Sequence, residues 1–395
     1  MNYQILLSTF KEKFEQEANR LFFAPGRINL IGEHTDYNGG NCFPCSITLG
    51  TYGLARKRTD DLIRMYSLNF PDIGIVEFTL DDLSYHKEHD WANYPKGMIR
   101  FIKEAGYPID SGMDVIYCGD IPNRAGLSSS ASIEMVTGVM IEGLFEFTMN
   151  RLDMVKLGKK VENDFIGVNS GIMDQFAIGM GKKGFGILLD SLTLEYAYAP
   201  IDLSNHSILI MNTNKSRELA DSKYNERRSE CKSALLQLQD AIIIQSLGEM
   251  TEEEFEAAKH VIKDETVRRR AKHAVYENRR TLSALDALKN GDLKTFGELM
   301  NQSHISLRDD YEVTGIELDT LVETAWKQKG LIGARMTGAG FGGCAIAVVE
   351  KEEVDNFIHA VRSTYQQQIG YQATIYAASI GDGAKEVALD EISIK

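Results

Sequence analysis

Cysteines, basic residues and long apolar runs are all scarce in this chain of 395 residues. Five cysteines cannot build a disulfide framework in so long a chain, as is usual where thiols stay reduced. No apolar run approaches the roughly 20 residues that cross a membrane. A formal net charge of −14 argues against the basic face that nucleic acids and anionic membranes require. We therefore expect a cytoplasmic protein without a nucleic-acid or membrane partner.

Two of the five cysteines, Cys42 and Cys45, form a C-x-x-C pattern. The sequence offers no second pair that would complete a zinc site, and a strand-like segment follows at residues 46–55. A redox pair is the alternative interpretation. Because cysteine is commonly just a small buried hydrophobic residue, we favour two buried thiols.

The chain has two to three times the usual length of a domain, so we expect two domains with a substrate cleft between them. Near the N-terminus, Leu6, Phe10, Phe14 and Ala18 recur every four residues, which predicts an amphipathic helix and not a signal peptide. Apolar runs predict short strands at residues 62–67, 115–118, 186–190, 207–212 and 344–349.

Charged helical stretches lie between residues 221 and 300. Each half therefore mixes helices with strands, and periodicity predicts an α+β protein. No linker or repeat marks a boundary. The change of pattern places the N-terminal domain at residues 1–203 and the C-terminal domain at 204–395.

The two commonest ATP-binding signatures, the P-loop and the protein-kinase H-R-D and D-F-G motifs, are both missing. Residues 126–132 instead read GLSSSAS and enter a helical pattern. Unpaired N–H groups and the helix dipole at such a start can hold a polyphosphate, which small residues let come close. A well-capped helix without a ligand is the alternative.

A second glycine-rich segment, residues 336–344, reads MTGAGFGGC and precedes a strand. A dinucleotide-binding turn follows a strand and opens a helix, so that interpretation is poor. A loop at which two backbones come close is the simpler one.

Residues 26–40 read GRINLIGEHTDYNGG and gather polar side chains around short turns. Carboxylates beside an imidazole suit the hydroxyls of a sugar, which both donate and accept hydrogen bonds. A metal site ranks lower because the helical His pair of zinc proteases is missing. An exposed polar turn is not excluded.

The fourth segment, residues 161–176, reads VENDFIGVNSGIMDQF. Leu157, Val161 and Phe165 share a helical stripe with Glu162 at its edge, and small residues break the helix before Asp174. Alone, Glu162 would be a solvated surface charge and Asp174 an N-cap.

Together these segments resemble the GHMP kinase superfamily and, within it, the galactokinases. The segments at 26–40, 126–132 and 336–344 are similar to the three family motifs. NSGIMDQF at 169–176, MNTN at 211–214 and SKYNER at 222–227 also fit. The resemblance runs from about residue 22 to residue 380. It implies an N-terminal domain like ribosomal protein S5 domain 2, a ferredoxin-like C-terminal domain, and an active site between them.

The resemblance implies transfer of the γ-phosphate of ATP to the C1 hydroxyl of α-D-galactose, the first step of galactose catabolism. Asp174 would accept or orient the proton of that hydroxyl. Arg27 would keep Asp174 ionised and stabilise charge in the transition state. Since phosphoryl transfer has a loose transition state, positioning and charge neutralisation supply most of the catalysis.

The resemblance also assigns binding roles. Mg²⁺ would be held by the hydroxyl of Ser130 and by Glu162, both hard oxygen ligands. The galactose pocket would be lined by Glu33, His34, Thr35, Asp36 and Tyr224. The triphosphate of ATP would be held by the loop Arg124, Ala125, Gly126, Leu127, Ser128, Ser129 and Ser130, with a less secure nucleotide contact at Ser67.

One position departs from the family pattern, since many galactokinases carry glycine where this chain has Arg124. A guanidinium there could itself bind phosphate. Two other functions remain open: a kinase for a related sugar such as N-acetylgalactosamine or arabinose, and a galactose-sensing regulator without turnover. We expect a monomer whose partners are galactose and ATP.

Overall fold

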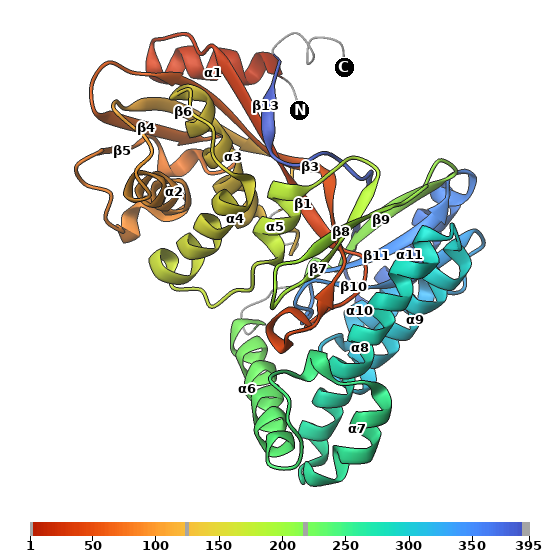
Figure 1. The fold of residues 1–395 in the computed structure, drawn as a ribbon. Coiled ribbons are helices and arrows are strands. Elements are labelled where there is room, and N and C mark those ends of the chain that lie inside the picture. The colour runs from red at the N-terminus through yellow and green to blue at the C-terminus, as the bar shows by residue number, and fades with distance from the viewer. Residues whose placement is uncertain (1–2, 123–125, 216–219, 389–395) are drawn as a thin grey trace.

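The computed structural model describes residues 3–122, 126–215 and 220–388 (Figure 1). Helices and strands occur in both halves, which confirms the α+β class. The five predicted strands are all present, as β4 (Leu62–Ser67), β6 (Met113–Gly119), β7 (Phe185–Asp190), β9 (His206–Asn212) and β11 (Cys344–Glu350). The N-terminal helix is shorter than predicted: it ends at Phe14, before Ala18. None of the helices in these three ranges combines the length and apolar character needed to cross a bilayer.

The first half is built on a six-stranded sheet. In spatial order its strands are β13 (Lys385–Val387), β1 (Arg20–Asn29), β3 (Pro44–Lys57), β6 (Met113–Gly119), β4 (Leu62–Ser67) and β5 (Val76–Thr79). Neighbouring strands are antiparallel except for β4 and β6. The helices of this half are α1 (Tyr3–Phe14), α2 (Asn93–Glu104), α3 (Ser129–Leu144), α4 (Arg151–Lys160) and α5 (Met173–Met180).

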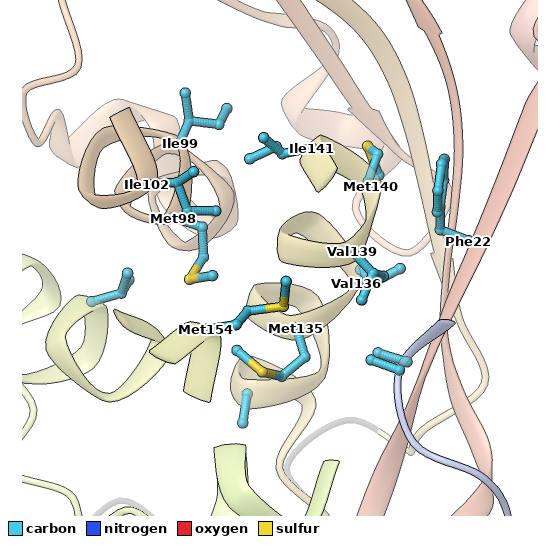
Figure 2. Close-up of a cluster of buried hydrophobic side chains, with 14 of the residues drawn as sticks. Phe22, Met98, Ile99, Ile102, Met135, Val136, Val139, Met140, Ile141 and Met154 are labelled. Atoms are coloured by element: carbon cyan, nitrogen blue, oxygen red, sulfur yellow. The ribbon is translucent and has the colours of Figure 1, made fainter. Parts of the chain in front are cut away.

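A core of large side chains joins the six-stranded sheet to helices α2 to α5 (Figure 2). Phe22 points from β1 toward α3, and methionines from α2, α3 and α4 meet between the helices. Methionine is unbranched and fills irregular gaps between helices. This packing holds the first turns of α3 and α5 close to the end of β1.

Two further sheets complete the fold. The three-stranded sheet consists of β2 (Asn41–Cys42), β7 (Phe185–Asp190) and β8 (Tyr196–Pro200). The four-stranded sheet has the order β10 (Leu331–Thr337), β11 (Cys344–Glu350), β9 (His206–Asn212) and β12 (Thr374–Ala378). The helices of the second half are α6 (Ala220–Gln239), α7 (Glu252–Ala258), α8 (Glu265–Lys289), α9 (Leu293–Asp309), α10 (Gly315–Ala325) and α11 (Val354–Ile369).

The two halves share buried contacts. One apolar cluster contains Ile28 of β1, Ile210 of β9, Ile346 of β11 and Leu285 of α8. Near the C-terminus, the chain returns to the first sheet, where β13 pairs with β1. The division between residues 203 and 204 stays a prediction.

Cys42 and Cys45 are both buried and free. Burial raises the pKa of each thiol, so the reactive thiolate is disfavoured. The interpretation of small buried hydrophobic residues fits these surroundings.

Helix α9 and strand β10 come into backbone contact at two glycines. A Cβ on Gly297 would lie 2.0 Å from the carbonyl oxygen of Ile332, and a Cβ on Gly333 would lie 2.6 Å from the Cα of Gly297. Real Cβ atoms do not come this close to backbone, so the helix could not keep its distance from the strand with any larger residue.

We predict that Gly297→Ala lowers stability by ~1–3 kcal/mol, because the added methyl forces the helix away from the sheet. A thermal melt followed by circular dichroism would measure the fall. Glu298→Ala, an exposed change on the same helix, serves as the control and leaves the melting temperature nearly unchanged. Equal melting temperatures for the two variants would contradict the close contact.

Candidate active site

A β-bulge in β1 sets the direction of Arg27. The register between β1 and β3 shifts between Pro25 and Arg27, where proline has no N–H to donate. The backbone N–H of Arg27 instead donates to the carbonyl of Leu127, 3.2 Å away. A Cβ on Gly26 would lie 2.9 Å from that carbonyl oxygen, so only glycine allows this approach. The bulge thus seats β1 against the predicted phosphate loop.

The guanidinium of Arg27 forms a two-point ion pair with Asp174. Its Nε lies 2.8 Å from Oδ1 and its Nη2 lies 2.9 Å from Oδ2. The remaining Nη1 donates to the carbonyl of Gly126 at 2.6 Å. Asp174 lies in the first turn of α5, whose N-cap is Ile172, so the N-cap interpretation is wrong. The two predicted catalytic residues are therefore in direct contact.

The loop before α3 reaches the same aspartate. Ser128 occupies the N-cap position of α3 in a left-handed conformation, with φ of 62°. Its hydroxyl donates to Asp174 and does not cap the helix. The first N–H groups of α3 are thus left without a cap from Ser128, as anion binding requires. Arg124 and Ala125 lie outside the described residues.

Glu162 lies in the π-helical turn at Val161–Ile166 and is only 6% exposed, so it is not a surface charge. The hydroxyl of Ser130 donates to its Oε1 at 2.7 Å, and the hydroxyl of Ser170 donates to its Oε2. Burial, followed by the negative charge of Asp174, raises the pKa of Glu162. A divalent cation would relieve this repulsion, and the carboxylate–hydroxyl pair is of the donor type that suits Mg²⁺.

Glu134 and Gln175 lie behind Glu162. Both side chains are fully buried, and Gln175 donates to Glu134 Oε2 at 3.0 Å. Burial and the nearby Glu162 raise the pKa of Glu134 well above its usual value. Sequence reasoning missed this third acidic group because a glutamate inside a helix carries no motif of its own.

Glu33 is buried at the end of the loop that follows β1. Its Oε1 accepts from Asn29 Nδ2 at 3.0 Å, and its Oε2 lies 2.8 Å from Arg335 Nη2. Burial raises the pKa of Glu33, while Arg335 and Asn29 act in the opposite direction.

His34 uses both ring nitrogens within the protein. Burial, with the neighbouring His273, lowers its pKa to about 3, so the ring is neutral near pH 7. Its Nε2 lies 3.2 Å from the carbonyl of Ala339, and its Nδ1 lies 2.7 Å from the Tyr37 hydroxyl. Because a carbonyl only accepts, Nε2 carries the proton and Nδ1 accepts from Tyr37.

Of the other three predicted sugar-site residues, Asp36 and Tyr224 line the site, whereas Thr35 is buried in the turn. Asp36 begins the short 3-10 turn at Asp36–Asn38, and burial together with the charge of Asp174 raises its pKa. Tyr224 approaches from α6, with its ring centroid 5.6 Å from that of His34. Thr35 instead donates its hydroxyl to the carbonyls of Gly32 and Asn41 and is fully buried in the turn.

A cavity of about 380 Å³ opens between the two halves at this point. It brings together four of the five predicted sugar-site residues, all except Thr35, with both predicted catalytic residues, and adds a wall from the loop before α5. Its lining includes Arg27, Glu33, His34, Asp36, Asn169, Ser170, Asp174, Tyr224, Asn225, Gly338 and Ala339.

A second cavity of about 230 Å³ lies beyond the first turn of α3. Ser67, at the end of β4, lines it together with Ser129 and Ser130. Sequence reasoning missed its aromatic wall, because these side chains come from separate elements and share no motif. That wall consists of Phe70, Trp91, Tyr94 and Tyr117.

The segment at residues 336–344 forms the connection from β10 to β11 and opens no helix. Gly338 has φ of 83°, and its Cβ would lie 3.3 Å from the carbonyl oxygen of Gly126. The preference for a close backbone approach over a dinucleotide turn is therefore confirmed. The loop joins the sugar motif, through Ala339 and His34, to the phosphate loop.

Three family models match the chain. The galactokinase galactose-binding signature matches residues 8–57, the GHMP kinase N-terminal domain matches 93–182, and the GHMP kinase C-terminal model matches 284–367. The first match contains the sugar motif, and the second contains the phosphate loop, Glu162 and Asp174.

Curated relatives match nearly the whole length of the chain. The galactokinase of Exiguobacterium sibiricum is 60% identical over 392 residues, covering 99% of this chain and all of the relative. The galactokinase of Ligilactobacillus salivarius is 58% identical over 385 residues, covering 98% of this chain and all of the relative.

Solved structures agree. The Lactococcus lactis galactokinase complexed with galactose superposes with a TM-score of 0.94 at 54% identity, covering 98% of this chain and all of that chain. The Methanococcus jannaschii mevalonate kinase, at 19% identity, covers 92% of this chain and 99% of that chain with a TM-score of 0.66, which shows the fold alone. The chain therefore has the GHMP kinase fold and belongs to the galactokinase family.

Proposed function

We propose that this protein transfers the γ-phosphoryl group of ATP to the C1 hydroxyl of α-D-galactose, giving α-D-galactose 1-phosphate and ADP. The observation that carries the proposal is the cavity in which residues of the galactose-binding signature, Arg27 among them, meet Asp174. A relative with 54% identity was solved with galactose bound.

Asp174 is the proposed catalytic carboxylate. In the transfer, the C1 hydroxyl gives its proton to Asp174, its oxygen forms a bond with the γ-phosphorus, and the bond from that phosphorus to the departing ADP oxygen breaks. Arg27 holds the carboxylate by two bonds and reaches the phosphate loop by a third. It can therefore orient the base and stabilise charge on the transferring group.

We assign the phosphates of ATP to the uncapped first turn of α3 and the adenine to the aromatic cavity beside it. Glu162 and the Ser130 hydroxyl are the proposed protein ligands of Mg²⁺. When held there, the ion would neutralise negative charge on the triphosphate of ATP. Arg124 and Ala125 belong to the same proposed loop.

The sugar pocket is assigned to Glu33, Asp36 and Tyr224, which line the cavity with groups that can receive hydroxyls. His34 has no free ring nitrogen, so we assign it the role of a rigid wall. Thr35 shapes the turn. We further propose a cytoplasmic monomer, with domains at residues 1–203 and 204–395.

Related functions are separated by one assay. Purified protein is incubated with ATP and Mg²⁺ and with galactose, N-acetylgalactosamine or arabinose, and ADP is measured. We expect the highest kcat/KM with galactose. A preference for another of these sugars would overturn the substrate, and binding of galactose without ADP release would favour a sensor.

For Asp174→Ala, we predict a fall in kcat of ~10³-fold or more, because the acceptor hydroxyl loses its base. Affinity for ATP, measured by calorimetry, should stay close to that of the parent, since the carboxylate acts on the sugar. Near-normal turnover in this variant would refute the assignment.

For Glu162→Ala, we predict that half-maximal activity needs ~10–100-fold more Mg²⁺, because the ion loses its proposed charged ligand. A titration of activity against free Mg²⁺ measures the shift. Asp164→Ala, an exposed change in the same π-helical turn, is the matched control. If both variants had the same Mg²⁺ dependence, Glu162 would be withdrawn as a ligand.

For Phe70→Ala, we predict a rise of about fivefold in the KM for ATP, because the base loses one aromatic contact. Phe70 is 41% exposed, so the change should not endanger folding. Tyr85→Ala removes another exposed aromatic side chain, outside the cavity, and should leave this KM unchanged. Equal KM values for ATP in both variants would contradict the assignment of the adenine to this cavity.

A further inference from the structure

Arg335 is among the largest fully buried side chains of the described residues, although it carries a charge. It projects from β10, in the second half, into the base of the sugar motif. Its Nη1 donates to the carbonyl of Asn29 at 2.9 Å and its Nε donates to the Ser303 hydroxyl at 3.1 Å, while Nη2 forms an ion pair with Glu33, 2.8 Å from its Oε2. Burying a charge is costly, so a buried arginine with three polar contacts to one motif and its neighbours calls for an explanation.

Glu277 of α8 holds the backbone of the same motif. Its Oε1 accepts the N–H of Gly32 at 3.0 Å and of Glu33 at 3.3 Å. The Ser303 hydroxyl donates to the same oxygen at 2.5 Å. Although burial acts to raise the pKa of Glu277, the charges around it, Arg280 first, lower it to about 2. This carboxylate is therefore ionised at every pH at which the protein would be assayed.

The buried carboxylates and guanidinium groups form one network around Glu33. Glu33 and Glu277 supply two negative charges, while Arg335 and Arg280 supply two positive ones, so the buried set is neutral. Ser303 joins the two halves of the network, because it donates to Glu277 and accepts from Arg335. Among these groups, Glu33 lines the sugar cavity.

The loop of the sugar motif packs tightly against α8 at Gly32. Gly32 has φ of 88°, and a Cβ there would lie 2.7 Å from the carbonyl oxygen of Asn41 and 2.8 Å from the hydroxyl of Thr281 on α8. The loop is thus pressed against α8, and the direction of Glu33 depends on the partners that α8 and β10 provide.

We infer that Arg335 is a specificity-determining positioning residue: together with Glu277, it fixes the plane and the charge of the Glu33 carboxylate, so that Glu33 only accepts a hydrogen bond from a sugar hydroxyl. A carboxylate with a fixed direction rejects a sugar that lacks the matching hydroxyl, because a buried acceptor oxygen then loses its hydrogen bond. The inference rests on the proposed function, since it takes the cavity as the galactose pocket.

The test uses Arg335→Lys, which keeps the charge and loses the planar fork. We expect the KM for galactose to rise ~10-fold and the KM for ATP to change by less than about twofold, because only the sugar pocket is disturbed. Arg270→Lys is the matched control. Arg270 is also buried and paired with carboxylates, Glu230 and Glu312, but it does not contact Glu33.

A double-mutant cycle with Glu33→Gln separates positioning from general stability. If Arg335 acts through Glu33, Arg335→Lys should add little to the galactose KM once Glu33 is already changed. Additive effects, an equal rise in the KM for ATP, or the same rise in Arg270→Lys would each overturn the inference. If the unaltered protein failed to phosphorylate galactose, the proposed function would fall first, so the two failures are distinguishable.

A milder variant keeps the inference testable if Arg335→Lys does not fold. Ser303→Ala leaves the charges of Arg335 and Glu277 in place and removes the hydroxyl that hydrogen-bonds to both. We expect the galactose KM to rise about threefold with an unchanged KM for ATP, because Arg335 loses one of its three anchors. An unchanged galactose KM in this folded variant would overturn the inference.

Discussion

The two-point ion pair between Arg27 and Asp174 is the contact on which the rest of the site depends. It joins a strand, a helix and the phosphate loop, because Arg27 also donates to the carbonyl of Gly126. Charge-assisted bonds of this kind have fixed geometry, so the pair sets the distance between base and phosphate site. The bulge at Pro25 and Gly26 is the backbone feature that makes this reach possible.

The second half of the chain completes the first. The loop after β10 contacts the phosphate loop at Gly338 and the sugar motif through Ala339. Glu277 binds the backbone of the sugar motif, and Arg335 pairs with its Glu33 side chain. An apolar cluster with side chains from both halves packs the halves against each other. Because each half supplies contacts that the other lacks, the cavity between them has fixed walls, and the polar groups in it are preorganised.

Much of the fold and site could be predicted from local patterns. Apolar runs predicted strand β4 at its bounds, and short motifs predicted a phosphate loop and a sugar loop. Residues whose partners lie far along the chain could not be predicted in this way. Glu162 alone gave the pattern of a surface charge, yet it is buried, and its hydrogen bonds come from Ser130 in the phosphate loop and from Ser170, eight residues further along the chain. Trp91 and Tyr94 carried no signal, since only folding places them beside Ser67.

The sequence by itself determined the chemical groups and the family: a motif-bearing galactokinase relative with an aspartate, an arginine and a serine-rich loop. Only the tertiary structure decided which of those groups face the cavity. Thr35 turned inward to backbone carbonyls, and His34 used both ring nitrogens on protein partners. The physical reason is that a hydrogen bond needs its two atoms within about 3 Å, and such distances are set by packing between elements and not by neighbours in sequence.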